Sequence, residues 1–144
     1  MDSSFYAAFA AFGMIIILIG LAIFILLLAA EWKIFSKAGK PGWAALIPIY
    51  NIYVRSNVAF GNMVYFIAFL VIAVINFIGK TSEVGGLNSL GALCTLILHI
   101  VYCINISKAF GKSAGFTVGL ILLPVIFFPI LAFGRDEYIG PQKI

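Results

Sequence analysis

Long apolar runs without charge limit what this chain can fold into more than any other feature of its sequence. The first run, Tyr6–Ala30, holds 25 residues, which make about 37 Å of helix at a rise of about 1.5 Å per residue. Similar runs cover about 58–79, 87–107 and 114–134. Each is long enough for a helix that crosses a hydrocarbon core of about 30 Å. The sequence therefore predicts an all-α, polytopic membrane protein with four transmembrane helices.

The composition agrees with this class. Of the 144 residues, 64% are hydrophobic and 10% are charged, whereas soluble domains are about 45–50% apolar and about 25% charged. We expect a single transmembrane domain over residues 1–144. The lysines and arginines lie beside the predicted spans and not on a separate basic face, so nucleic acid is not an expected partner.

A cationic turn rich in glycine and proline follows the first run, and we call residues 36–42 the first basic turn. Lys37 and Lys40 supply its charge, while Gly39 and Pro41 end any helix that arrives from upstream. The apolar stretch that follows, about 43–54, has 12 residues, or roughly 18 Å of helix, which is too short to cross a bilayer. Its aromatic side chains suit the headgroup level. We predict a short interfacial or re-entrant helix here.

The first basic turn has a partial copy at residues 107–116, the second basic turn. Each copy reads Ser-Lys-Ala, then Gly-Lys, then Gly and an aromatic residue, and the second copy has extra residues inserted. Both copies follow a predicted span and fall on the same side of the membrane. This pattern is typical of two helix–turn–helix halves, about 1–80 and 81–144, in a parallel two-fold repeat.

The distribution of lysine and arginine predicts the orientation of the chain. One side holds six of them: Lys33, Lys37, Lys40, Arg55, Lys108 and Lys112. The other side holds three: Lys80, Arg135 and Lys143. Since cytoplasmic loops carry the excess of positive charge, we expect both basic turns in the cytoplasm and both termini outside it.

Two stretches resemble a known family. Residues Trp32–Asn51, which read Trp-Lys-Ile-Phe-Ser-Lys-Ala-Gly-Lys-Pro-Gly-Trp-Ala-Ala-Leu-Ile-Pro-Ile-Tyr-Asn, resemble the signature of an uncharacterised bacterial family of small multi-pass membrane proteins. Lys108–Lys112 and Pro129–Gly134 look like the closing motif of that family. Related segments form the N-terminal membrane module of some type I signal peptidases. The resemblance implies a multi-pass protein of the bacterial cytoplasmic (inner) membrane, and it implies no activity.

The lysines of the basic turns are candidate lipid ligands: Lys37, Lys40, Lys108 and Lys112. Glycine-rich turns at helix starts expose free N–H groups, which bind anions, and a lipid phosphate is the natural anion at this depth. The alternative is that these lysines only fix the topology and extend to the interface. That alternative is favoured.

A polar stripe follows one face of the predicted span 87–107, where Thr95, His99, Cys103 and Ser107 occur at steps of four residues. An ionisable residue in a span suggests a proton or ligand pathway. The alternative is a neutral His99 that is hydrogen-bonded to Thr95 or to Asn76 of a neighbouring span and joins the two helices. We favour this second interpretation, since no Asp or Glu lies within a predicted span to extend a relay.

Enzyme chemistry is not expected. Serine lies beside lysine at three places: Ser36-Lys37, Ser107-Lys108 and Lys112-Ser113. A Ser–Lys mechanism needs a neutral lysine, whereas these turns are wet and keep lysine charged. Cys94 and Cys103 lie on opposite sides of a helix and cannot pair. With one histidine beside these two cysteines, neither a metal nor a cofactor is expected.

The expected function is that of a small integral membrane subunit that packs with, or scaffolds, a larger membrane assembly. Gly13 and Gly20 lie on one face of the first span, and the fourth span carries a Gly115-x-x-x-Gly119 pair. Small residues like these allow a neighbouring helix to approach closely. The expected partners are membrane lipids and other integral membrane proteins or a second copy. The alternative is a small oligomeric transporter or channel that uses the His99 polar stripe.

Overall fold

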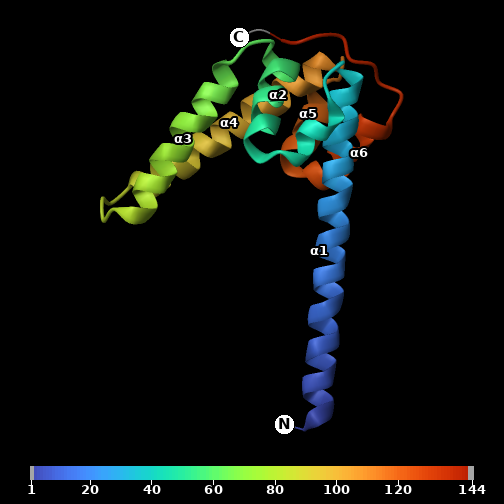
Figure 1. Cartoon of the computed structure of the whole chain (residues 1–144), viewed down its shortest axis with the longest axis vertical. Helices are drawn as coiled ribbons and strands as arrows, with labels where there is room; N and C mark the ends of the chain where they lie inside the picture. Colours follow the sequence, from blue (N-terminus) through green and yellow to red (C-terminus); the bar gives the residue numbers. More distant parts are fainter. Residues whose placement is uncertain (1, 143–144) are drawn as a thin grey trace.

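The computed structural model describes residues 2–142, which form α-helices joined by short turns and contain no strand (Figure 1). In chain order the elements are α1 (Ser3–Lys37), the 3-10 turn η1 (Gly42–Leu46), α2 (Pro48–Phe60), α3 (Val64–Thr81), α4 (Leu87–Ala109), α5 (Ala114–Leu122) and α6 (Pro124–Phe133). The predicted all-α class is confirmed. Three helices, α1, α3 and α4, are long and apolar enough to cross a membrane.

Helix α1 is the longest element, with 35 residues. Its first turn is capped by Asp2, whose side chain accepts a hydrogen bond from the amide of Phe5 at 3.1 Å. Only Ala30, Ile34 and Phe35 of this helix are buried. The N-terminal part projects past the other helices without a neighbour (Figure 1), so most of α1 presents apolar side chains to its surroundings.

The two basic turns end their helices with the same backbone conformation. Gly39 and Gly111 have φ values of 74° and 69°, in the left-handed region that favours glycine. In each turn the amide of the next residue, Lys40 or Lys112, donates to the carbonyl five residues earlier at 2.9 Å. This bond is the usual end of a helix with a left-handed glycine. The repeated Gly-Lys pair therefore marks two equivalent helix ends.

The predicted interfacial helix is longer than 43–54, and the predicted second span starts too early. Helix α2 continues to Phe60, and α3 begins at Val64, so the first residues of the expected span 58–79 belong to α2. Gly61, with φ 72°, ends α2, and the side chain of Asn62 accepts from the amide of Val64 at 3.0 Å. The apolar run is continuous across this break, and hydropathy does not reveal it.

The η1–α2 segment starts and ends at the same end of the bundle. Gly42 packs against the ring of Trp32 near the end of α1. At the other end of the segment, the carbonyl of Val58 accepts from the hydroxyl of Tyr138 at 2.7 Å, close to the second basic turn. The segment therefore leaves this end of the bundle and returns to it.

The predicted fourth span, 114–134, is wrong as a single helix. Helices α5 and α6 have 9 and 10 residues, about 14–15 Å each, and neither crosses a bilayer alone. Pro124 starts α6 and lacks the N–H that would continue α5. The rings of Phe116 and Phe127 lie 5.3 Å apart, whereas a continuous helix would separate them by about 16 Å. The chain therefore folds back, and three helices, not four, qualify as spans.

Residues 134–142 run across one end of the bundle, and we call them the C-terminal strap. The amide of Ile139 donates to the carbonyl of Ala109 at 2.7 Å, and the amide of Gln142 donates to that of Ala59 at 2.8 Å. The strap thus joins the ends of α4 and α2. The prediction that Arg135 lies opposite the basic turns is wrong, because the α5–α6 hairpin returns the chain to them. Lys143 lies outside the described residues.

The buried core lies under the basic turns and the strap. Its largest fully buried apolar side chains are Phe35, Phe60, Ile106, Leu120 and Leu131. They come from α1, α2, α4, α5 and α6, so each of these helices contributes to one cluster. The α3–α4 pair extends away from this cluster (Figure 1) and buries little of its surface. The buried side chains are therefore concentrated at the end of the bundle where the two basic turns lie.

Candidate functional site

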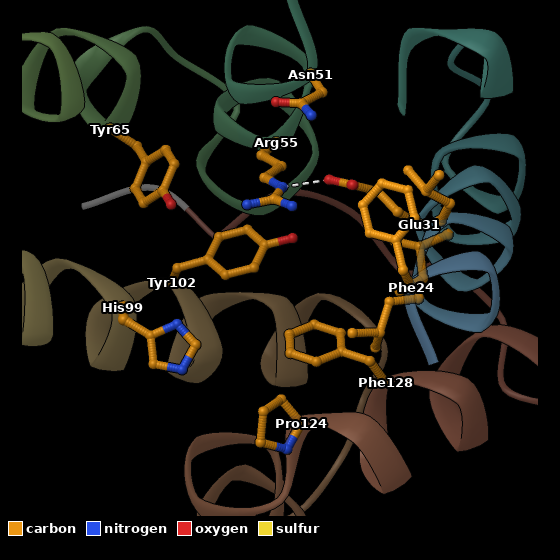
Figure 2. Close-up of a pocket in the computed structure, with 12 residues that line it drawn as sticks. Phe24, Glu31, Asn51, Arg55, Tyr65, His99, Tyr102, Pro124 and Phe128 are labelled. Atoms are coloured by element: carbon orange, nitrogen blue, oxygen red, sulfur yellow. Dashed lines mark hydrogen bonds and ion pairs between the residues drawn. The ribbon is translucent and has the colours of Figure 1, made fainter. Parts of the chain in front are cut away.

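A cavity of about 390 Å³ lies below the basic turns, among α1, α2, α4, α6 and the start of α3 (Figure 2). Polar and apolar side chains line different parts of it. The polar lining residues are Glu31, Asn51, Arg55, Tyr65, His99 and Tyr102. The apolar ones are Phe24, Leu27, Leu28, Ile34, Pro124 and Phe128. The cavity is thus amphipathic.

An ion pair between two helices forms the polar wall. Nε of Arg55 on α2 donates to a carboxylate oxygen of Glu31 on α1. The side chains are 31% and 14% exposed, respectively, so the pair is largely withdrawn from the surface. The carboxylate of Glu31 accepts this hydrogen bond and supplies the counter-charge of the guanidinium. The guanidinium therefore remains charged inside the protein.

Two tyrosines complete the surroundings of the guanidinium. The carbon at its centre lies 5.7 Å from the centroid of the Tyr102 ring, a cation–π arrangement. The Tyr65 and Tyr102 rings lie 5.3 Å apart, and both hydroxyls point toward Arg55 (Figure 2). The Tyr65 hydroxyl also lies within hydrogen-bonding reach of the guanidinium. Arg55 thus presents charged N–H donors to the cavity while it remains partly exposed.

The predicted polar stripe of α4 divides among three environments. The amide of Asn76 on α3 donates to the Thr95 hydroxyl at 3.1 Å, so this pair joins α3 to α4. His99 lines the cavity, with its Nε2 3.6 Å from the sulfur of Cys103. Cys103 and Ser107 are fully buried in the core. The side chain that bonds Asn76 is therefore Thr95, and the histidine faces the hollow.

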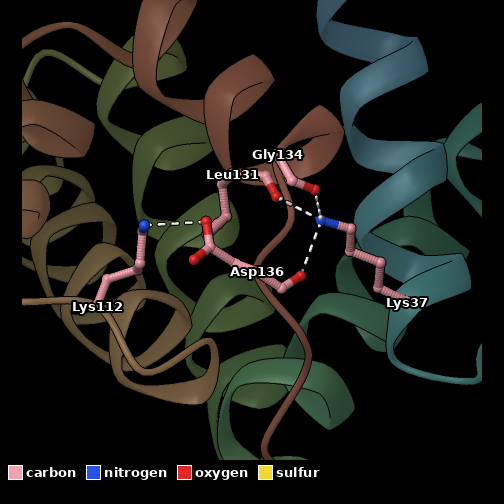
Figure 3. Close-up of polar contacts among 5 residues, drawn as sticks. All are labelled: Lys37, Lys112, Leu131, Gly134 and Asp136. Atoms are coloured by element: carbon pink, nitrogen blue, oxygen red, sulfur yellow. Dashed lines mark hydrogen bonds and ion pairs between the residues drawn. The ribbon is translucent and has the colours of Figure 1, made fainter.

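Lys37 is held by protein groups (Figure 3). Its ammonium donates to the carbonyls of Leu131, Gly134 and Asp136 at 2.9, 3.0 and 3.0 Å. An ammonium has three donors, and all three are used here. The acceptors lie at the end of α6 and just beyond it, where a helix leaves carbonyls without partners. The geometry makes Lys37 a cap for α6.

Asp136 connects Lys37 to the second basic turn. Its carboxylate pairs with the ammonium of Lys112 at 2.9 Å (Figure 3), and that ammonium also lies 4.7 Å from the centroid of the Phe116 ring. Lys40 and Lys108 differ from these two residues, because both are exposed. Of the four lysines proposed as lipid ligands, these two present their charge outward.

The two glycines of the Gly115-x-x-x-Gly119 pair lie in different surroundings. A Cβ atom at Gly119 would overlap the ring of Phe127 on α6, so this glycine allows α5 and α6 to pack closely. A Cβ atom at Gly115 would meet no atom closer than the Ser113 hydroxyl at 3.9 Å. Gly119 is therefore used within the chain, and Gly115 faces open space.

The ion pair and the role of Asp136 do not follow from the sequence alone. Glu31 and Arg55 are 24 residues apart, and no local pattern joins them. A usable signal is the presence of one acidic and one basic residue on apolar helices, since such charges are rarely buried unless they are paired. In the described part of the chain, no group of three or more His, Cys, Asp or Glu side chains could hold a metal ion.

Comparison with known proteins gives one match. The sequence model of a protein family whose description reads "family of unknown function" matches residues 43–141, from η1 into the C-terminal strap. No curated protein and no solved structure matches the chain. The matched stretch includes the α2, α3, α4 and α6 sides of the cavity, while Glu31 and the rest of the α1 wall lie before it.

Proposed function

The chain belongs to DUF5684, a family of unknown function, and from that premise we propose that it is a non-enzymatic integral membrane subunit. It packs through α1 against another integral membrane protein and thereby contributes to a larger assembly. The observation that carries this proposal is the projection of α1 beyond the bundle (Figure 1). The most apolar 18-residue window of α1 buries none of its residues within the chain. The likeness of Trp32–Asn51 to the membrane module of type I signal peptidases fits this role.

One face of α1 suits a helix partner. Gly13 and Gly20 lie seven residues apart on this face, and a Cβ atom at either would meet nothing within 4 Å. Helices in lipid associate through close packing at small residues, because lipid gives no hydrophobic driving force between them. The open surface at these glycines therefore favours a second helix over a purely lipid-facing role.

Purification of the full chain from its native membrane in mild detergent tests this proposal. The double variant Gly13→Ile/Gly20→Ile should lose the associated membrane protein, because the added side chains prevent close approach. The control is Ala22→Ile, an exposed position roughly opposite Gly13 on the helix, which should retain it. A photoreactive residue at Ile17 should cross-link to the same partner. Recovery of that partner in full with both variants would contradict the proposal.

We also propose that Lys40 and Lys108 contact anionic lipids, since both are exposed at the basic-turn end. Each lysine near an anionic surface contributes about 1 kcal/mol. The variant Lys40→Gln/Lys108→Gln should therefore retain less phosphatidylglycerol in a lipid-binding assay than the unmodified chain. The matched control is Lys33→Gln, also exposed but outside both turns. Equal retention by all three proteins would leave these lysines with a topological role only.

A second candidate function is a small oligomeric transporter or channel, which the position of His99 favours. This histidine lines the same cavity as Glu31 and Arg55, and ionisable groups at membrane depth commonly mark ion or proton paths. In proteoliposomes, His99→Phe should abolish proton flux if the chain conducts protons. The same variant should leave association through α1 unchanged. Flux that is equal in both proteins would contradict this candidate.

For localisation we propose the bacterial cytoplasmic membrane, with the basic turns and the C-terminal strap in the cytoplasm. The basic-turn end carries Lys33, Lys37, Lys40, Lys108, Lys112 and Arg135, whereas the last turn of α3 carries Lys80. The rule that positive loops stay inside supports this orientation. It places the Ser3 end of α1 on the outer side.

A further inference from the structure

We propose that the cavity beside Glu31 and Arg55 binds an uncharged amphiphile that enters from the membrane. Its head carries a carbonyl or hydroxyl group and lies against Arg55, and its hydrocarbon body lies between α1 and α6. The inference concerns a ligand site inside the chain and does not depend on the subunit role. A diacylglycerol-like lipid and a quinone with an alkyl tail both have this chemistry.

The polar end of the cavity offers hydrogen-bond donors. A guanidinium carries five N–H donors, and Arg55 uses the one on Nε for Glu31. The Tyr65 hydroxyl lies within hydrogen-bonding reach of the guanidinium, and the Tyr102 hydroxyl lies with them on the polar wall (Figure 2). A ligand oxygen placed here gains a charge-assisted hydrogen bond from the N–H groups that face the cavity.

The charge balance of the cavity selects an uncharged head. Glu31 already neutralises Arg55, so an anionic head would add an uncompensated charge beside the carboxylate of Glu31. A cationic head would likewise add an uncompensated positive charge beside the guanidinium of Arg55. Uncompensated charge in a site of low dielectric constant is strongly unfavourable. A neutral acceptor bonds to the donors that face the cavity without this penalty.

The apolar end of the cavity fits a hydrocarbon body. Phe24 and Leu28 of α1 line it, as do Pro124 and Phe128 of α6. Phe24 precedes Glu31 by seven residues, about 10 Å along the helix, and lies farther from the basic turns. The apolar walls thus extend inward from the polar ones, in the direction in which a lipid of that leaflet extends. The volume of about 390 Å³ lies within the range of about 300–1,000 Å³ for small-molecule sites.

Photolabelling of the full chain in detergent micelles tests the site directly. The probe is dioctanoylglycerol with a diazirine at one chain end. We expect labels on residues 24–28 of α1 and 124–128 of α6, and competition by unlabelled dioctanoylglycerol or by a decyl-substituted benzoquinone. If dioctanoylglycerol competes more strongly, the head of the natural ligand resembles that of a diacylglycerol. If the benzoquinone competes more strongly, it resembles that of a quinone. Dioctanoyl phosphatidic acid, with the same chains and a charged head, should compete roughly tenfold less well.

Two variants test whether the apolar end and the polar wall of the cavity each contribute to the binding free energy. Leu28→Trp fills the apolar end, and Glu31→Leu/Arg55→Leu removes the polar wall without leaving an unpaired charge. Each should weaken binding of dioctanoylglycerol roughly 10- to 100-fold. The control is Leu122→Trp, at a position that is 70% exposed and does not line the cavity, and it should bind normally.

Three results would overturn the proposal: labels confined to other helices, equal competition by phosphatidic acid, or unchanged affinity in Leu28→Trp. The labelling pattern and the competition are measured on the unmodified chain, so they decide the question even if a variant folds poorly. Loss of the α1 partner with retained labelling would contradict the subunit role alone. Retention of the partner without labelling would contradict the ligand site alone.

Discussion

Lys37 stands at the end of α1, where a membrane helix usually exposes its cation to solvent and headgroups, but its ammonium is bonded to three carbonyls. We expect Lys37→Met, which keeps the apolar stem, to lower the free energy of unfolding by about 2 kcal/mol, since hydrogen bonds to a charged group contribute about 1.5–3 kcal/mol each when buried and less when partly exposed. Lys40→Met should change it little, because Lys40 is exposed. Thermal unfolding in detergent measures both, and equal effects would contradict the capping role.

The Glu31–Arg55 pair gives a second prediction for single residues. Glu31→Leu leaves a partly buried guanidinium without its counter-charge and should cost about 2 kcal/mol of stability, less than for a fully buried pair. Replacing both residues by leucine removes the unpaired charge and should cost less than the single change. Chemical unfolding of the three variants measures this difference. If the losses were additive, the two side chains would not be coupled in the folded protein.

Whether the sequence predicts the contacts of a single residue depends on how far along the chain its partners lie. The cap at Asp2 and the left-handed turns at Gly39 and Gly111 involve neighbours along the chain, and sequence reasoning reaches such features. The carbonyls around Lys37 come from residues 94 to 99 positions away. No local pattern shows that these groups meet, because the α5–α6 hairpin brings them together.

At the scale of elements, the α5–α6 hairpin depends on the lack of a side chain at Gly119. Gly119→Leu should lower stability by about 2 kcal/mol, since the new side chain overlaps Phe127 and overpacking costs about 1–3 kcal/mol. Gly115→Leu, in open space, should be close to neutral. Adding Phe127→Ala to the Gly119 variant should recover part of the loss. Thermal unfolding checks the series, and equal losses at both glycines would exclude this contact.

The helix boundaries also show where hydropathy predicts the start of a helix correctly and where it does not. The expected span 87–107 begins where α4 begins, because Gly86 and the preceding polar turn interrupt the apolar run. The breaks at Gly61 and Leu123 fall inside apolar sequence, where hydropathy does not show them. The break at Gly61 moves the start of the second span, and the break at Leu123 removes the fourth. Pro124 starts a new helix instead of lying within one. Whether a proline bends or ends a membrane helix is decided by packing, here of Phe116 on Phe127.

For the whole molecule, the fold predicts which positions share a side of the membrane. In a Cys94→Ala/Cys103→Ala background, single cysteines at positions 40, 108 and 135 should react with an impermeant maleimide from one side. A cysteine at position 83, in the α3–α4 turn, should react from the other side. A topology in which α1, α3 and α4 cross the membrane, while η1–α2 and α5–α6 return to the side they left, requires this pattern. Labelling of position 135 from the side of position 83 would mean that residues 114–134 cross after all.

The C-terminal strap also fixes the order in which this protein can be completed. Residues 134–142 leave the ribosome after every helix, and they donate to carbonyls at the ends of α2 and α4 and supply acceptors to Lys37. Until they emerge, those groups must stay hydrated at the membrane surface. Insertion of the helices and closure of their basic-turn ends are therefore separate events in biogenesis, and the second event waits for the end of translation of this segment.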